Sequence, residues 1–182
     1  NKFLTDALEL EKQKVPTRKL LEDPYHFWYI GKSYFDSTLG DYPLGMDHIK
    51  EYARRSIFYF AQYLNFKHEY HITGQAKGLD ELGYFAFYAM GDMYKLCGNY
   101  EKALDCGMKA EEFAPSRNEH IVLQAECFKD LSDFDSMKVQ TERLMSPDRK
   151  LPFPEYNFLL NMEHYNDSGK YCEQLHQIAN QV

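Results

Sequence analysis

Residues 87–100 have the sequence FYAMGDMYKLCGNY, and residues 121–134 repeat its pattern 34 positions later as IVLQAECFKDLSDF. Three pairs at this spacing match in size class: Gly91 with Ala125, Tyr94 with Phe128, and Tyr100 with Phe134. Ala103 and Met137 share the spacing but differ in size, so the repeat is imperfect. A fixed period in this range is typical of a helical solenoid. The repeat therefore predicts an all-α fold, and it favours a binding or scaffold module over a self-contained enzyme.

The inner helices of the repeat carry a recognisable signature. Phe27, Ile30, Gly31 and Tyr34 fit the tetratricopeptide pattern aromatic-x2-aliphatic-Gly-x2-Tyr, and residues 87–94 fit it again. We expect a right-handed α-solenoid of antiparallel helix hairpins, tetratricopeptide-like, with about seven to nine helices in a single domain. The predicted repeats cover about 24–64, 84–115, 118–149 and 153–181, after a partial leading helix at 1–23. Long loops at 36–46 and 65–80 stretch the first repeat.

Small residues predict where the helices of one hairpin cross. Gly91 and Ala103 are expected at the crossing, because only small side chains let two backbones approach closely. Tyr94 and Tyr100 would fill the space beside them.

Composition excludes several classes of function. The net charge of −7 argues against a nucleic-acid footprint, and no apolar run approaches the about 20 residues of a membrane span. The first residues lack the features of a signal peptide, and the start at Asn1 suggests a fragment of a longer protein. The four cysteines form neither a zinc-binding nor a disulfide pattern. We expect free, mostly buried thiols and a cytoplasmic location.

The layout resembles the tetratricopeptide-like segment that follows the catalytic domain in many family 2 glycosyltransferases. The residues that carry this resemblance are Leu10-Glu11-Lys12, Glu22-Asp23-Pro24, Phe27 to Tyr34, Gly91, Ala110 and Pro115-Ser116-Arg117-Asn118-Glu119. It spans roughly residues 8–135, and the long loops depart from it. The resemblance implies a parent enzyme that transfers a sugar from a nucleotide-sugar with a divalent metal. Its catalytic domain would precede Asn1, because this chain shows no strand-turn-helix unit and no phosphate loop.

Two short motifs could carry chemistry, and both have a plainer interpretation. Asp133-Phe134-Asp135 has the D-x-D form of glycosyltransferase metal sites, but it lies at the repeat turn opposite Asn99-Tyr100-Glu101. We interpret it as a helix-capping turn with Phe134 in the core. His68, Glu69 and His71 could offer metal ligands, but no further ligand follows at a fixed spacing, and a solvated polar loop is favoured.

The concave face of the inner helices is the best candidate for binding. Aligning the helices on Gly31, Gly91 and Ala125 predicts which side chains share this face. They are Tyr25, Trp28, Lys32 and Phe35 in the first helix, Phe85, Tyr88, Asp92 and Lys95 in the second, and Glu119, Val122, Glu126 and Lys129 in the third. Such aromatic and charged residues could stack on sugar rings or hold a peptide. Alternatively, Trp28, Phe35 and Phe85 pack on the absent domain or on a second copy of the chain.

The leading hypothesis is a non-catalytic module of a glycosyltransferase that positions an acceptor glycan or protein, mediates self-association or braces the catalytic domain. The second is a stand-alone adaptor that binds a peptide in its groove. The third is a small helical metal protein or enzyme that uses His68 and His71. A glycosyltransferase module should expose an apolar patch near its N-terminal helix, an adaptor should bind a peptide tightly on its own, and a metal protein should retain metal.

Overall fold

The computed structural model describes residues 25–40, 45–69, 76–146 and 148–149, and every regular element in these ranges is a helix. The helices are α3 (Tyr25–Leu39), α4 (Met46–Glu69), α5 (Ala76–Leu96), α6 (Tyr100–Phe113), α7 (Glu119–Asp130) and α8 (Phe134–Leu144). The predicted all-α class is confirmed for this part of the chain. The predicted leading helix at 1–23 and the fourth repeat at 153–181 lie outside the described residues.

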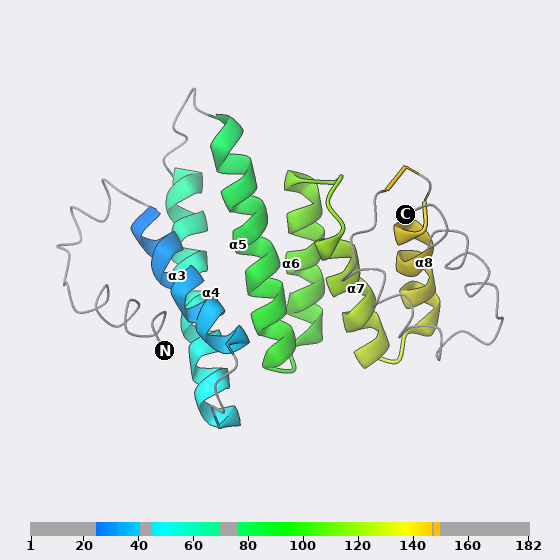
Figure 1. Cartoon of the computed structure of the whole chain (residues 1–182), viewed down its shortest axis with the longest axis horizontal. Coiled ribbons are helices and arrows are strands. Elements are labelled where there is room, and N and C mark those ends of the chain that lie inside the picture. The colour runs from blue at the N-terminus through cyan, green and yellow to red at the C-terminus, as the bar shows by residue number, and fades with distance from the viewer. Residues whose placement is uncertain (1–24, 41–44, 70–75, 147, 150–182) are drawn as a thin grey trace.

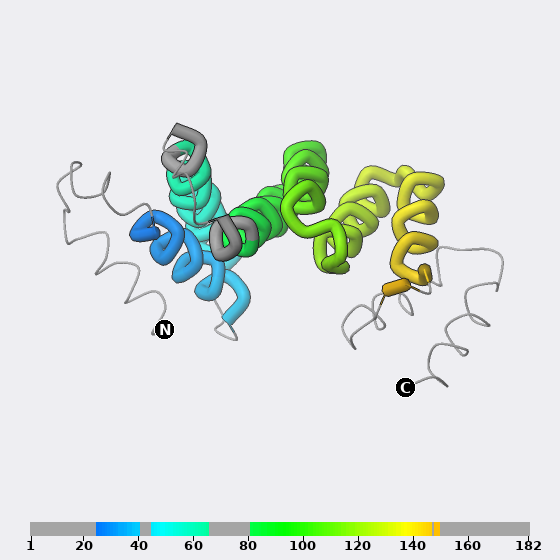
Figure 2. The backbone as a smooth tube through the Cα atoms, turned by 90° about the horizontal axis from the view of Figure 1, so that it is seen from above, coloured from blue at the N-terminus to red at the C-terminus, as the bar shows by residue number. Residues whose placement is uncertain are grey.

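Successive helices run antiparallel and side by side, in a row from α3 and α4 to α8 (Figure 1). Each helix contacts the next one along the chain, and α5 also contacts both α3 and α7. Seen from above, the row zigzags, with α4 and α6 toward one side and α3 toward the other (Figure 2). The contacts of α5 bring side chains from three alternate helices together.

Three helices extend into stretches that the sequence predicts as loops, and one of them, α5, does so by beginning at Ala76. Helix α3 continues to Leu39, and the hydroxyls of Ser37 and Thr38 donate to the carbonyls of Ser33 and Phe35 within the same helix. Helix α4 continues to Glu69, because no Gly or Pro interrupts residues 47–69. The predicted loops are therefore too long in this part of the chain.

The turn between the helices of a hairpin is repeated in atomic detail. Gly98 has a φ of 78° and Ser132, 34 residues later, has a φ of 61°. The amide that follows each of them donates to a carbonyl five residues back, from Asn99 to Tyr94 and from Asp133 to Phe128. This is a Schellman motif, in which a left-handed residue ends the helix. The predicted equivalence of the two turns is therefore confirmed.

Four apolar cores hold the described helices together, and the smallest of them packs Ile30 and Tyr34 of α3 against Tyr52 and Tyr59 of α4. The largest lies between α3, α4 and α5 and contains Trp28, Phe35, Phe60 and Met93. A second lies where α5, α6 and α7 meet, with Ala103, Leu123 and Cys127 buried against tyrosines. The third joins α7 to α8.

Gly91 lies at the predicted crossing of α5 and α6. A Cβ atom placed there would lie 3.3 Å from the carbonyl oxygen of Ala103. The expected role of the two small residues is confirmed.

One predicted core residue lies on the surface. Phe134 is 46% exposed at the start of α8, whereas Tyr100 at the equivalent position packs beside the α5–α6–α7 core. Both residues begin a helix, but Tyr100 packs with Leu123 and Cys127 of the following helix α7. The cysteine prediction holds for the described residues: Cys106 and Cys127 are buried, Cys97 is half-buried, and all three are free thiols. Burial raises the pKa of Cys106 and of Cys127 to about 12. Of the described helices, none has the length and apolarity needed to cross a membrane.

Candidate functional site

Side chains from α3, α5 and α7 form a connected surface, which we call the inner strip. It consists of the accessible or half-buried residues Tyr25, Tyr29 and Lys32 on α3, Phe85, Tyr88, Asp92 and Lys95 on α5, and Glu119, Glu126 and Lys129 on α7. The ammonium group of Lys32 lies 5.8 Å from the centre of the Phe85 ring, which links α3 to α5. Ion pairs and hydrogen bonds link α5 to α7.

The structure corrects the expected exposure of two candidates. Trp28 is only 8% exposed and Phe35 only 5%. The indole N–H of Trp28 donates to the carbonyl oxygen of Leu82 at 3.3 Å, and its ring lies 5.4 Å from that of Phe85. Both residues are therefore core side chains between α3 and α5. The alignment on Gly31 fixed the repeat but not the direction in which each side chain points.

Tyr29 is the exposed aromatic residue that sequence reasoning missed. It is 58% exposed, and it lies four residues after Tyr25 and three before Lys32, so the three share one face of α3. The Tyr25 ring is 38% exposed and its centre lies 6.5 Å from that of Tyr63. The signal was present in the sequence, because an aromatic residue follows Trp28 directly and points about 100° away around the helix.

One end of the contact between α5 and α7 is a hydrogen-bonded carboxylate. The Tyr84 hydroxyl donates to Glu119 Oε2 at 3.0 Å, and the Arg117 guanidinium pairs with Glu119 Oε1 at 3.0 Å. The same guanidinium lies 4.6 Å from the centre of the Tyr84 ring. Burial would raise the pKa of Glu119, but the hydrogen bonds from Arg117 and Tyr84 hold it below its usual value. Glu119 is thus a fixed negative charge at the start of α7.

The other end of that contact is an ion cluster. Lys95 pairs with Glu126 of α7 and lies 3.6 Å from Asp92, one helical turn earlier on α5. Burial would lower the pKa of Lys95, but the two carboxylates raise it. Burial raises the pKa of Asp92 even though Lys95 and the Tyr88 hydroxyl favour its charged form. Lys95 therefore interacts with two carboxyl groups, and the cluster contains more acidic than basic side chains.

The tyrosine rings of α5, Tyr84 and Tyr88, are not open platforms for sugar rings. Tyr84 is 1% exposed, and its ring stacks on that of Tyr88 with centres 6.3 Å apart and planes 5° from parallel. Burial raises the pKa of both hydroxyls. These rings hold α5 against α7, and the accessible chemistry of the strip lies in its charges and in the α3 tyrosines.

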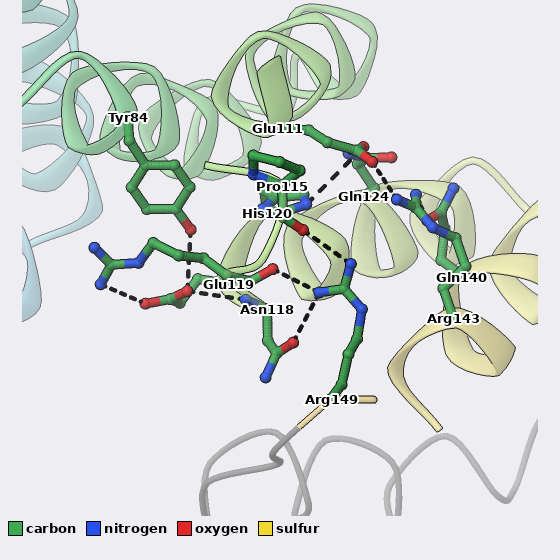
Figure 3. A network of polar contacts seen from close by, with 11 residues as sticks. Tyr84, Glu111, Pro115, Asn118, Glu119, His120, Gln124, Gln140, Arg143 and Arg149 are labelled. Atoms are coloured by element: carbon green, nitrogen blue, oxygen red, sulfur yellow. Dashed lines mark hydrogen bonds and ion pairs between the residues drawn. The ribbon is translucent and has the colours of Figure 1, made fainter. Parts of the chain in front are cut away.

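A second polar network joins α6, α7 and α8 (Figure 3). Glu111 on α6 accepts hydrogen bonds from Arg143 on α8 and Gln124 on α7. Arg149 donates to the carbonyl oxygens of Pro115 and Arg117 at 2.9 Å and to Asn118 Oδ1 at 3.0 Å. Arg149 therefore braces the loop that carries the proline, arginine and asparagine of the family resemblance.

The remaining candidates have structural surroundings. Asp133 accepts from the amide of Ser136 at 3.1 Å and caps α8, as Asn99 caps α6, so the capping interpretation of the D-x-D motif is confirmed. The ammonium group of Lys129 lies 3.9 Å from Asp130.

His68, Glu69 and His71 fall outside the side chains that the structure describes. Across the described part of the chain, no three His, Cys, Asp or Glu side chains form a group suited to a metal ion.

No protein-family model and no curated protein matches the chain.

Proposed function

We propose that this chain is a cytoplasmic, non-catalytic tetratricopeptide-like module of a family 2 glycosyltransferase, a right-handed stack of helix hairpins that associates with another protein surface. The nucleotide-sugar and divalent-metal chemistry belongs to a separate catalytic domain of the parent. The module binds either that catalytic domain or the protein acceptor. A second copy of the chain is the third candidate partner.

One observation supports this proposal: five of the nine exposed large apolar side chains of the described residues lie on the first described hairpin, and two of them, Tyr25 and Tyr29, are one helical turn apart. Five large apolar residues that are at least 38% exposed lie on α3, on α4 or at the helix ends that join them: Tyr25, Tyr29, Leu39, Met46 and Phe58. Neighbouring exposed apolar side chains, such as Tyr25 and Tyr29, mark interaction surfaces. A glycosyltransferase module is expected to expose such a patch near its N-terminal end.

The inner strip gives this surface its chemistry. Tyr29 and Tyr25 supply flat apolar area with polar tips, and tyrosine is enriched where protein interfaces concentrate their binding energy. Next to them, Lys32 pairs with Asp36, and the Lys95 cluster carries a second carboxylate. Mixed charges of this kind specify orientation more than they supply affinity. A protein surface fits this arrangement better than a sugar ring does, because Tyr84 and Tyr88 cover each other.

Photo-crosslinking in the source cells tests the proposed surface. A photoreactive phenylalanine analogue replaces Tyr29 in one version of the native protein and Met108 in a control. Met108 is 50% exposed on α6, close to the 58% of Tyr29, but it lies on a helix that does not contribute to the strip. We expect a defined crosslinked protein from position 29 and none from position 108. Equal crosslinking from both positions would count against the surface.

The mass of the native protein tests the parent assignment separately. An antibody to this segment captures the protein from its source, and intact-mass analysis measures it. A species much heavier than 21.5 kDa with an α/β sequence ahead of Asn1 supports a glycosyltransferase. A species near 21.5 kDa leaves the stand-alone adaptor, which is the second candidate.

A further inference from the structure

His120 is a buried histidine without a hydrogen-bond partner. It lies in the first turn of α7, its side chain is 0% exposed, and neither ring nitrogen has a hydrogen-bond partner. Its ring meets that of Tyr84 edge-on, with centres 6.1 Å apart, and its backbone carbonyl lies beside Gly107 of α6. The imidazole therefore sits at the junction of α5, α6 and α7 (Figure 3). A buried imidazole in this state is tolerated while it is neutral and costs much more when charged.

The groups around His120 would do little to stabilise a positive charge on its ring. The nearest carboxylate oxygen, Glu111 Oε2, lies 3.9 Å from Nε2, which is beyond hydrogen-bond distance. Glu111 already accepts from Arg143 and Gln124, so its charge is shared with an arginine.

The other charged or titratable groups near the ring come from α5, α7 and α8 and from the segments before α7 and after α8. Tyr84 of α5 and Arg117 both direct their polar atoms to Glu119 of α7. Arg143 of α8 and Arg149 beyond it repel a positive charge on the ring. Burial, followed by these arginines, lowers the pKa of His120 to about 4, although Glu111 and Glu119 oppose the shift.

We propose that His120 is an acid-sensitive latch: its neutral ring allows α7 to pack on α5 and α6, and its protonation loosens this junction. The latch is a property of the chain beyond its proposed function as an association module. Because Glu119 and Tyr84 adjoin the ring, loosening at His120 would also disturb the contact between α5 and α7 that orders the inner strip.

The direction of the pH effect follows from proton linkage. The unfolded chain has a histidine pKa of 6.5 and binds this proton more readily than the folded chain, whose pKa is about 4. Well above pH 6.5 neither state is protonated and there is no penalty. As the pH falls from 6.5 to 4, the penalty grows, and below 4 it is constant. At pH 4.5 the unfolding equilibrium constant should exceed its value at pH 7.5 by on the order of 50-fold from this group alone.

Urea unfolding of matched variants between pH 7.5 and 4.5 tests the latch. His120→Phe keeps an aromatic ring against Tyr84 but cannot be protonated. The control is His48→Phe, because His48 is an exposed residue of α4. Other groups also titrate in this range, so the informative quantity is the difference in pH dependence between each variant and the parent. We expect His120→Phe to remove at least tenfold of the acid-induced increase and His48→Phe to remove none. Parallel pH profiles for the parent and His120→Phe would overturn the proposal.

A direct titration keeps the proposal testable if His120→Phe does not fold. The ring proton signals of the parent chain can be followed by NMR and assigned to His120 by comparison with His120→Gln. We expect a titration midpoint more than one pH unit below 6.5, or acid-induced opening before any midpoint is reached. A folded chain in which His120 titrates near pH 6.5 would refute the latch.

Discussion

Gly91 offers the sharpest test of how the helices pack. A Cβ atom added at this position would lie 2.4 Å from Cδ2 of Leu123 on α7, and 3.3 Å from both the Ala103 carbonyl oxygen and the Cys106 Cβ on α6. Heavy atoms do not approach to 2.4 Å without displacement. The Cδ2 atom of Leu123 is a terminal methyl group. The Leu123 side chain is only 1% exposed, so the surrounding core resists the rotation that would move this methyl group away. Helix α5 therefore touches α6 and α7 at a point with no room for a methyl group.

The change in the free energy of unfolding for Gly91→Ala is the difference between two opposing effects. Replacing glycine by alanine inside a helix stabilises it by about 0.5–1 kcal/mol, whereas overpacking a filled core costs about 1–3 kcal/mol. We expect Gly91→Ala to lower the free energy of unfolding by a net about 0.5–2 kcal/mol. Gly91→Leu adds three more carbon atoms to the same contact and should cost at least about 1–3 kcal/mol.

Gly107→Ala provides the matched control. Gly107 is also a buried glycine within a helix, so the helix-propensity gain is the same. Its added Cβ would meet Cγ of Gln124 at 3.0 Å, and no closer atom. Urea unfolding followed by circular dichroism gives both free energies. We expect Gly107→Ala to be the more stable variant by about 1 kcal/mol or more. If Gly91→Ala were as stable as Gly107→Ala, the proposed crossing would be wrong.

Further substitutions probe the turns and the contact between α5 and α7. Asn99→Ala removes the side-chain acceptor of the Lys102 amide and should cost about 1 kcal/mol in urea unfolding. Ser132→Gly removes the strain of a left-handed backbone conformation, about 1–2 kcal/mol, and adds an entropic cost of about 0.5–1 kcal/mol in the unfolded chain. Because the first effect is the larger, the variant should have higher thermal stability. Tyr84→Phe removes a hydrogen bond to Glu119 and should cost about 1.5–3 kcal/mol at pH 7. Because the pKa of Glu119 is lowered, this cost should persist to about pH 5 and diminish in stronger acid.

The fold could be predicted where the sequence repeats a local interaction. The 34-residue spacing equated Asn99 with Asp133, and both cap the helices that follow. The same spacing equated Gly91 with Ala125, which are buried at corresponding positions on α5 and α7. Capping, turn geometry and small residues at a crossing depend on a few neighbouring residues, so a single sequence contains enough information to find them.

The candidate site was predictable only in part, because exposure depends on several helices at once. On α3, Trp28 and Tyr29 have similar chemistry, and the choice of which one is buried is made by Phe60 of α4 and Phe85 of α5. The pairing of Lys95 with Glu126 lies within the predicted set, since both residues had been placed on one face. The contact of Arg149 with the loop at 115–118 could not be predicted from local sequence, because Arg149 donates to backbone oxygens about one repeat earlier in the chain.

The contacts of the inner strip decide which residues can report on binding. Glu119 and Glu126 hold α7 against α5, so loss of binding in a variant of either carboxylate could follow from displaced helices. Tyr29 differs, because its described ring contact is with its neighbour Trp28 on the same helix, and 58% of its surface remains accessible. Tyr29→Ala should therefore leave the free energy of unfolding nearly unchanged and still weaken association by about 2 kcal/mol if it is central to the interface. A stable Tyr29→Ala variant that binds its crosslinked partner as tightly as the parent chain would exclude α3 from that interface.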